Sequence, residues 1–364
     1  MLVGLQAGSA TRPPGDEPAP RGAMHADTVH SRELSSMSAA FTLKPLIKRG
    51  ALVTAANWQV VVAMFVADAL FKALLLVPVA GGVLLVVLLV GGDPVDLLSA
   101  SPSEGLAAMA QVLLAHAGAF GAFLVSVALV LAGGAFLMLI ARGGAVAVLV
   151  AGERSAGDIE EPPLRFGALS RAARFSLERF TQGSEHLFRR YVALGLGLAA
   201  VYAASMGGYL VLILGASPVA PDWPFMAGAA SLALVAWFTL VNFVYLLFQV
   251  VIGRSDCGVR AAAGEVWRLL TARGGAAWRV FGAILVLVVL ATAGSVLATA
   301  ALGLIAFVPL VGLVALPLQL IAWAVRGAVF QFIELTALVA YLRILRGDEP
   351  PPPAESDTTY PRPA

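Results

Sequence analysis

Four charged residues stand inside long apolar runs of the sequence, and their types and positions could support chemistry. Asp68 and Lys72 lie in one run, and Arg326 and Glu334 lie in another. A charged side chain at the centre of a lipid bilayer costs about 3 kcal/mol or more, so it normally faces a partner or a polar cavity. Carboxylates and cations in that position relay protons or bind charged solutes in pumps and transporters.

The spacing of these residues limits which pairs can form. Asp68 and Lys72 are four positions apart, so they share one helix face and can pair locally. Arg326 and Glu334 are eight positions apart, about 12 Å along a helix axis, which is too far for direct contact. Counted from the ends of the two runs, Asp68 and Glu334 have similar depths. The sequence therefore predicts a neutral cluster of all four residues between the first and the last run.

Three interpretations of this cluster remain open from the sequence. It can be a polar network that locks helices together, a relay for protons or a solute, or the result of a segment boundary that leaves one charge near the lipid headgroups. Four neutral polar residues in the apolar runs are interpreted as interhelical hydrogen-bond partners. They are Asn242, Gln249, Gln319 and Gln331.

The signature motifs of soluble enzymes are absent from the sequence. It has no G-x-x-x-x-G-K-[ST] phosphate loop, no H-E-x-x-H, no C-x-x-C and no G-x-S-x-G. The single cysteine, Cys257, cannot form an internal disulfide, and four histidines are too few for most metal cages. We therefore expect no catalytic residue, no metal site, no cofactor and no enzymatic activity.

Composition indicates which elements must position the charges. The 364 residues are 59% hydrophobic and 13% charged, with a mean hydropathy of +0.87, whereas a soluble domain is roughly 45–50% apolar and about 25% charged. The apolar runs exceed the roughly 18 residues that mark a membrane-spanning helix. Runs such as VLLVVLLV also lack the alternation of a transmembrane β-strand. The sequence predicts an all-α, polytopic transmembrane helix bundle.

We predict six spanning segments, at residues 60–90, 119–150, 191–216, 226–252, 279–302 and 318–345. The first two are longer than a hydrocarbon core of about 30 Å needs, so they must tilt, kink or emerge from the membrane. Pro78 is the expected break in the first segment, because proline removes a helix hydrogen bond. Arg142-Gly143-Gly144 is the corresponding weak point in the second.

Basic residues gather on one side of these segments. The connections 91–118, 217–225 and 303–317 contain four acidic residues and no Lys or Arg, whereas the other connections and both flanks are rich in arginine. Because positive residues in short loops stay in the cytoplasm, we expect both termini there. The seven arginines between the second and third segments can bind anionic lipid headgroups, at about 1 kcal/mol each near the surface, or only set the topology. We expect membrane lipids and unidentified proteins as partners, and no nucleic acid.

Two stretches on the basic side, 165–190 and 259–273, have apolar residues at helical spacing. In the second, the apolar residues are Val259, Ala262, Val266 and Leu269, with Arg260, Glu265 and Arg268 off that stripe. Such stripes predict amphipathic helices at the membrane surface. An interfacial helix followed by a hairpin is then used three times, unless the similarity reflects only the aromatic belts and inner arginines of any polytopic protein.

Small residues repeat every four positions in two of the segments, from Gly195 to Gly207 and from Ala291 to Gly303. This spacing allows the backbones of two helices to approach closely. The two faces can therefore pack within the bundle or form a homodimer.

The two ends of the chain differ from its centre in composition. Residues 1–40 mix proline, glycine, serine and charged residues without an apolar run, so we predict a disordered segment. The alternative is that translation starts at Met24 or Met37. Residues 347–364 form a proline-rich polar tail, also predicted to be disordered, and residues 41–346 form the transmembrane domain.

The layout of the chain carries a resemblance to a known class of protein. It combines amphipathic helices on the basic side with boundaries such as Phe188-Arg189-Arg190-Tyr191, and ends its last run with Ala340-Tyr341-Leu342-Arg343-Ile344-Leu345-Arg346. Over about residues 41–346 it resembles bacterial six-helix integral membrane proteins, which are similar to the membrane domain fused to some glycerophosphodiester phosphodiesterases. The resemblance implies a six-helix fold. It carries over no catalytic residue, because the catalytic barrel of that enzyme has no counterpart here.

Two classes of function fit these observations. The first is a non-enzymatic membrane component that organises lipids or partner proteins at its basic cytoplasmic face. The alternative is a transporter or permease component that uses the charges of the first and last segments, and a membrane-embedded enzyme is a third possibility. The excess of arginine over lysine and the many alanines suit a bacterium with GC-rich DNA, so we expect the protein in a bacterial inner membrane.

Overall fold

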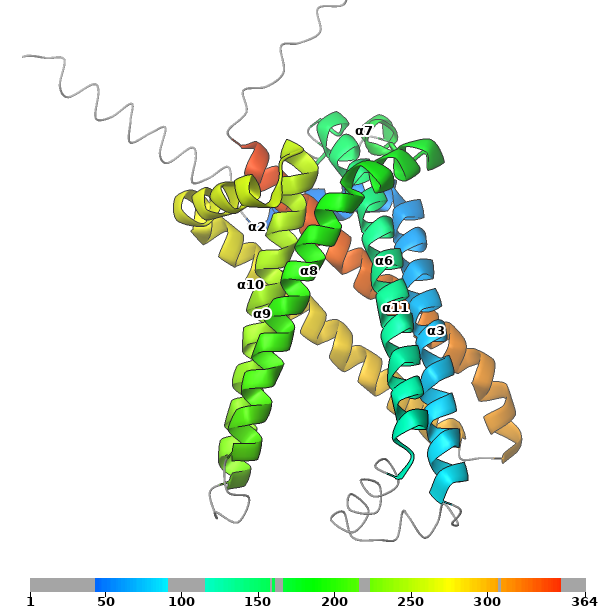
Figure 1. Ribbon diagram of the computed structural model, residues 1–364. Helices are drawn as coiled ribbons and strands as arrows, with labels where there is room; N and C mark the ends of the chain where they lie inside the picture. Colours follow the sequence, from blue (N-terminus) through cyan, green and yellow to red (C-terminus); the bar gives the residue numbers. More distant parts are fainter. Residues whose placement is uncertain are drawn as a thin grey trace, which may run out of the picture. The chain divides into compact units, whose positions relative to one another are not determined.

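The computed structural model describes residues 43–90, 115–157, 159–160, 166–215, 223–306 and 309–347. Helices account for nearly all of these residues, and the predicted all-α class is confirmed. In these ranges the helices are α2 (Leu43–Ala56), α3 (Trp58–Val90), α6 (Ala117–Ser155), α7 (Phe166–Ala172), α8 (Leu177–Gly215), α9 (Trp223–Ser255), α10 (Val259–Ala306) and α11 (Pro309–Arg346) (Figure 1). The predicted end segments 1–40 and 347–364 lie outside the described residues, apart from Gly347.

Six of the described helices are long and apolar enough to cross a membrane. Their candidate spans are Trp58–Gly82, Phe120–Ser155, Leu177–Ile213, Phe225–Ser255, Val259–Leu304 and Pro317–Arg346. Each contains most of one of the predicted segments. The protein is therefore a polytopic transmembrane helix bundle.

Several helices are longer than the segments predicted from hydropathy. α8 begins at Leu177 and α10 at Val259, so each amphipathic stretch continues directly into a spanning helix. Only the first part of the 165–190 stretch is separate, as α7. α10 bends at Arg273, where φ is −131° and ψ is 21°, just before two glycines that make a helix easy to bend.

The expected break at Arg142-Gly143-Gly144 does not occur, because α6 is continuous to Ser155. The two glycines instead let α8 approach closely. A Cβ at Gly144 would lie 2.7 Å from the ring and backbone oxygen of Phe180, and a Cβ at Gly143 would lie 3.1 Å from the Cα of Ser184. Helix α3 likewise continues past Pro78 to Val90.

Helices that follow one another in the chain pack together. α3 packs with α6, α8 with α9 and α10 with α11, while α6 also lies along α8. Polar pairs join α8 to α9: the Tyr202 hydroxyl donates to Asn242 Oδ1 at 2.7 Å, and Trp237 Nε1 donates to Ser205 Oγ at 2.9 Å. The prediction that Asn242 forms an interhelical hydrogen bond is confirmed.

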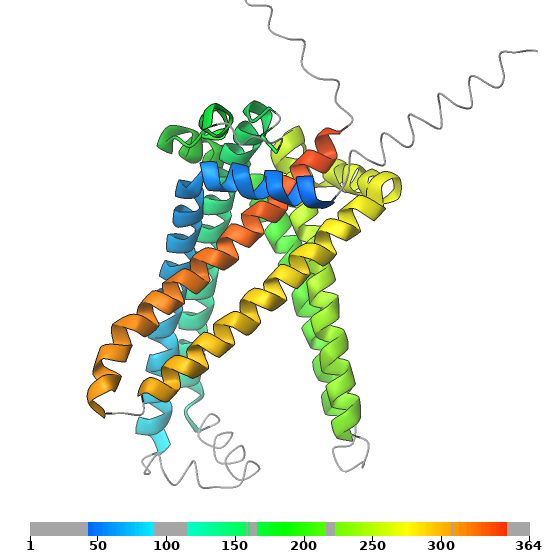
Figure 2. The ribbon, with the colours of Figure 1, turned by 180° about the vertical axis from the view of Figure 1, so that it is seen from behind.

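Helix α2 runs across the end of α11, transverse to it (Figure 2). Gly50 makes this crossing possible, because a Cβ there would lie 2.5 Å from the backbone oxygen of Thr336. We call this the basic end of the bundle: it holds α2, α7, the beginnings of α8 and α10, and the ends of α6, α9 and α11.

Buried side chains concentrate at the basic end. The largest fully buried ones include Arg49, Tyr191, Leu247, Tyr341 and Ile344. Towards the other end, large apolar side chains of α3, α8, α10 and α11 are exposed, as expected for helices that face hydrocarbon. The tight packing that can position functional groups is therefore at the basic end.

Candidate functional site

Glu334 does not join the other three residues of the predicted intramembrane cluster. Asp68 and Lys72 pair within α3, with Nζ 2.5 Å from Oδ2, as their spacing predicted. Together with Arg326 of α11 they line a cavity of about 510 Å³. Glu334 instead forms an ion pair with Arg142 of α6. The prediction of one four-residue cluster is therefore wrong for Glu334.

The geometry of α11 explains this correction. Arg326 and Glu334 are eight positions apart, which is more than two turns of the helix. Arg326 contributes to the cavity with α3 and α10, whereas Glu334 reaches α6. Arg142 was expected to be a weak point of its helix and not a partner of Glu334, although it stands inside an apolar run like the other four charges.

The ion pair of Arg142 and Glu334 belongs to a network of four helices. Arg142 Nη1 donates to Gln249 Oε1 of α9 at 3.0 Å, and the Tyr191 hydroxyl of α8 donates to the backbone oxygen of Gln249 at 3.0 Å. The predicted interhelical role of Gln249 is confirmed. Since Tyr191 and Gln249 are fully buried, the network holds α6, α8, α9 and α11 in register.

A second buried network attaches α2 to the basic end. Arg49 is 1% exposed, and its Nε donates to both carboxylate oxygens of Glu153 at 2.8 and 3.0 Å. Its Nη1 donates to Glu160 Oε2 at 2.6 Å and to the backbone oxygen of Gly157 at 2.5 Å. Burial acts to lower the pKa of Arg49, but Glu153 and Glu160 outweigh it and raise the pKa above its ordinary value. Arg49 is thus a fixed positive charge that holds two carboxylates.

The last turn of α11 completes this network. Arg346 Nη1 donates to the backbone oxygen of Glu153 at 3.2 Å, and Arg343 lies 3.7 Å from Glu160. Asn57 anchors the other end of α2, because its Nδ2 donates to the backbone oxygen of Ala172 and its Oδ1 accepts from the backbone N–H of Arg174. These contacts explain how α2 packs at the basic end, and they use most of the donors of Arg49 and Asn57.

The turn between α9 and α10 has its own ionic contacts. Asp256 adopts a left-handed conformation with φ of 49°, which aspartate tolerates better than most residues. Its carboxylate accepts from Arg190 and lies 2.7 Å from Nε2 of His186. Hydrogen bonding from Arg190, with a further contribution from His186, holds the pKa of Asp256 below its usual value.

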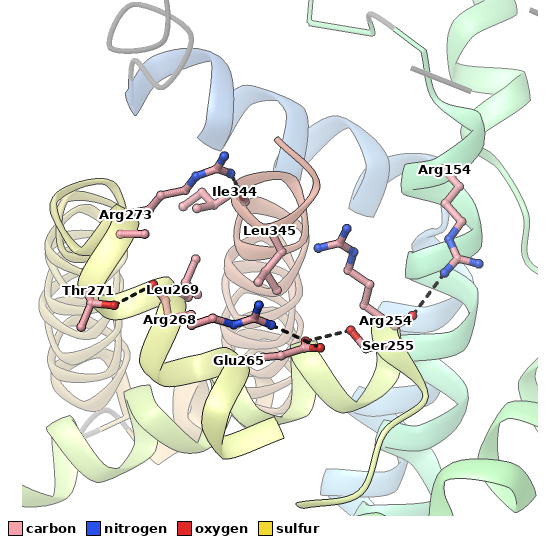
Figure 3. Close-up of a pocket in the computed structure, with 11 residues that line it drawn as sticks. Arg154, Arg254, Ser255, Glu265, Arg268, Leu269, Thr271, Arg273, Ile344 and Leu345 are labelled. Atoms are coloured by element: carbon pink, nitrogen blue, oxygen red, sulfur yellow. Dashed lines mark hydrogen bonds and ion pairs between the residues drawn. The ribbon is translucent and has the colours of Figure 1, made fainter. Parts of the chain in front are cut away.

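A cavity of about 570 Å³ opens beside this turn, and we call it the basic cavity. Its charged lining consists of Arg154, Arg254, Arg268, Arg273 and Glu265. Figure 3 shows that Arg154 comes from α6, Arg254 from the end of α9, and Glu265, Arg268 and Arg273 from α10, with Leu345 of α11 among them. The charged lining thus consists of four arginines and one glutamate.

Hydrogen bonds fix the frame of the basic cavity. Arg273 Nη1 donates to the backbone oxygen of Ile344 at 2.6 Å, and Arg154 Nη2 donates to the backbone oxygen of Arg254 at 3.3 Å. Glu265 accepts from Ser255 Oγ at 2.9 Å and lies 4.0 Å from Arg268 (Figure 3). The carboxylate of Glu265 is thus held between Ser255 and Arg268 at one side of the cavity.

The amphipathic first part of α10 positions two of these arginines. Ala262, Val266 and Leu269 are buried against the bundle, as their stripe predicted. Arg268 lies off that stripe and Arg273 lies at the bend. Because the lining residues come from four helices, hydropathy and spacing alone did not reveal the cavity; only the arginine content of the two connections pointed to it.

Arginine-lined cavities of this size suit an anion. A guanidinium presents planar paired donors that match phosphate and carboxylate oxygens, and volumes of about 300–1,000 Å³ are typical of ligand sites. In the part of the chain that the structure describes, no three His, Cys, Asp or Glu side chains come together as metal ligands. The arrangement can bind and orient an anionic group.

Comparisons with known proteins add no relative. The chain matches no protein-family model, no curated protein and no solved structure. The function must therefore be inferred from the membrane-spanning fold and from the geometry of the basic cavity.

Proposed function

We propose that this is a non-enzymatic protein of a bacterial inner membrane that binds the phosphate of an anionic lipid headgroup in the basic cavity. The observation that carries the proposal is that four arginines from three helices line one cavity of about 570 Å³. Phosphate is the anionic group that every phospholipid leaflet supplies at the ends of spanning helices.

The place of the cavity in the helices supports a lipid ligand. Arg154 and Arg254 stand in the last turns of two spanning helices, which is the depth of the headgroups. Trp267 is next to Arg268 and is 70% exposed, and tryptophan favours the interface between membrane and water. A lipid can therefore reach the arginines without leaving its leaflet.

The proposed orientation places the basic end in the cytoplasm, with both termini on that side. It rests on the absence of Lys and Arg from three alternate loops and on the retention of positive loops in the cytoplasm. The bacterial cytoplasmic leaflet would then supply the anionic lipid, and a bound lipid would fix the angle between α9 and α10 for protein partners at that face.

The test is a binding titration with purified protein in non-ionic detergent. Short-chain phosphatidylglycerol is added to the protein and to the double variant Arg154→Gln/Arg268→Gln, with short-chain phosphatidylcholine as the zwitterionic reference. At about 1 kcal/mol for each arginine, the double variant should bind phosphatidylglycerol about thirtyfold more weakly. The wild-type protein should prefer phosphatidylglycerol to phosphatidylcholine.

The matched control is Arg260→Gln/Arg279→Gln. Both residues are exposed on α10 and neither lines the basic cavity, so this variant loses the same charge and should bind as the wild type does. Equal losses in the two double variants would mean that overall charge, and not the cavity, attracts the lipid. Equal affinity for the two lipids would reject the proposal outright.

A further inference from the structure

Arg326 is an exposed cation in the interior of a membrane-spanning helix. Its span runs Pro317–Arg346, so Arg326 lies about 14 Å along the axis from one end and further from the other. Its guanidinium lies 5.8 Å from the ring centre of Phe330. The nearby carboxylates have other partners, since Asp68 pairs with Lys72 and Glu334 pairs with Arg142. A charge at this depth needs a compensating anion.

The cavity that Arg326 shares with α3, which we call the intramembrane cavity, has a net positive charge. Lys72, Asp68 and Arg326 line it, so one formal positive charge is left over. Gln331 also lines it, is 8% exposed, and has an Oε1 without a hydrogen-bond partner. Buried polar atoms without partners are uncommon, and a water, an ion or a ligand can supply the missing hydrogen bond. Charge and hydrogen bonding therefore point to a monoanionic polar ligand.

An apolar groove between α10 and α11 continues from the intramembrane cavity. The two share Trp323, Arg326 and Phe330. Small residues line the α10 side of the groove, which encloses about 570 Å³: Ala291, Gly294, Ser295, Ala298, Thr299 and Gly303. From Ala291 to Gly303 the groove extends about 18 Å along the helix, a little more than half of a 30 Å hydrocarbon core and so about the reach of one acyl chain.

We propose that Lys72 and Arg326 bind the carboxylate of a long-chain amphiphile whose single apolar chain lies in the α10–α11 groove. The single negative charge of a carboxylate matches the one uncompensated positive charge of the cavity. Small side chains line one wall of the groove, and its volume of about 570 Å³ and its length suit one apolar chain better than the two chains of a phospholipid. This site is separate from the basic cavity and does not depend on the proposed function.

The first experiment needs no variant. A nitroxide-labelled 16-carbon fatty acid and its methyl ester are added to the protein in non-ionic detergent, and tryptophan quenching is recorded. Because Trp323 lies in both the cavity and the groove, the acid should quench with saturation. The methyl ester lacks the negative charge, so its affinity should be at least about tenfold lower than that of the acid. Equal saturable quenching by both probes would overturn the proposal.

Variants then locate the two parts of the ligand. Arg326→Gln should weaken binding of the acid about tenfold or more, since it removes a charged hydrogen-bond partner. Ala298→Phe should fill the groove and weaken the 16-carbon acid more than an 8-carbon acid. Arg279→Gln and Arg268→Gln, which are outside this site, should bind as the wild type does. Wild-type affinity in Arg326→Gln, or loss of binding in Arg268→Gln, would refute the assignment.

The small-residue face of α10 also suits close packing against a second copy of this chain, which would then occupy the groove in place of the fatty acid. Light scattering of wild type and Ala298→Phe, each with and without the fatty acid, separates the two. A ligand site predicts the same oligomeric state in all four samples. Conversion of a wild-type dimer to a monomer by Ala298→Phe, with no saturable quenching by the acid, would assign the groove to self-association and overturn the proposal.

Discussion

Replacing Arg49 with methionine removes the guanidinium that holds α2 against the ends of α6 and α11. Methionine keeps much of the side-chain volume, so the main change is the loss of charge and of the hydrogen bonds at 2.5 to 3.0 Å to Glu153, Gly157 and Glu160. Glu153 is 2% exposed and keeps no other ion-pair partner among the described residues, whereas Glu160 retains Arg343 at 3.7 Å. The variant therefore strands one buried carboxylate.

The expected loss in free energy of unfolding is that of one buried carboxylate left without its partner. Removing one member of a buried ion pair typically destabilises a protein by about 3–5 kcal/mol, because the remaining charge is desolvated without compensation. Glu153→Gln alone should also be destabilising. In Arg49→Met/Glu153→Gln no stranded charge remains between the two, so the double variant should cost about 2 kcal/mol less than the sum of the single changes.

The free energy of unfolding can be measured by titrating sodium dodecyl sulfate into mixed micelles and following far-ultraviolet circular dichroism. Lys44→Met is the matched control, because Lys44 is an exposed cation on the same helix, and it should change the free energy of unfolding by less than about 0.5 kcal/mol. A change of that small size in Arg49→Met, or strict additivity in the double variant, would refute the reasoning about the buried network.

Three further predictions concern other parts of the basic end. Gly50→Ala should destabilise the protein by about 1–3 kcal/mol in the same titration, because the new Cβ would lie 2.5 Å from a carbonyl oxygen of α11. Gly264→Ala is the control: a Cβ at Gly264 has nothing within 4 Å, so this variant should stabilise the helix by about 0.5–1 kcal/mol. In intact cells, a cysteine introduced by Ser101→Cys should react with an impermeant thiol reagent, while native Cys257 should react only after permeabilisation. Both reactions are run at alkaline pH, because burial and the negative charge of Glu265 raise the pKa of Cys257. Folding lowers the pKa of Asp256 from 3.8, so the ionised carboxylate stabilises the folded protein above that pH. This stabilisation is lost as the pH falls through the pKa that Asp256 has in the folded state. The stability difference between wild type and Asp256→Asn should therefore shrink below pH 3.8.

Each of these predictions has a contrary outcome. Equal stability of the two glycine variants would show that α2 does not cross α11 closely. Labelling of Cys257 from outside intact cells would reverse the proposed orientation. A wild-type advantage over Asp256→Asn that is unchanged at pH 2 and pH 6 would mean that the charge of the carboxylate contributes nothing.

The α-helical class and the number of spans could be predicted from the sequence, because each span is a local property of one apolar run. The apolar stripe of Ala262, Val266 and Leu269 could also be predicted, because its helical periodicity is visible within a single segment of the sequence. The extent of the helices was not, as Gly143 and Gly144 show. The sequence predicted a break at these glycines. In the structure α6 is continuous there, and the absence of side chains at the two glycines allows α8 to pack closely against α6.

Contacts between helices were harder to predict. Asp68 and Lys72 pair on one helix, so spacing alone found them. Glu334 and Arg142 pair only because α11 lies against α6, and nothing in either segment specifies that neighbour. Arg49 belongs to the basic flank from which the orientation was predicted, but its burial depends on how α2 crosses α11 and contacts α6. The basic cavity combines four helices in the same way, so only its charge was foreseeable.

The docking of α2 on α11 also constrains how the protein is made. α2 leaves the ribosome early, yet its contact surface includes Thr336 and the backbone of Glu153, which Arg346 holds across 193 positions of sequence. Until α11 has been synthesised and inserted, Arg49 and Glu153 therefore have no complete burial site. We therefore expect the basic end to assemble late, after α11 has inserted, with the slow closure typical of contacts so distant in sequence.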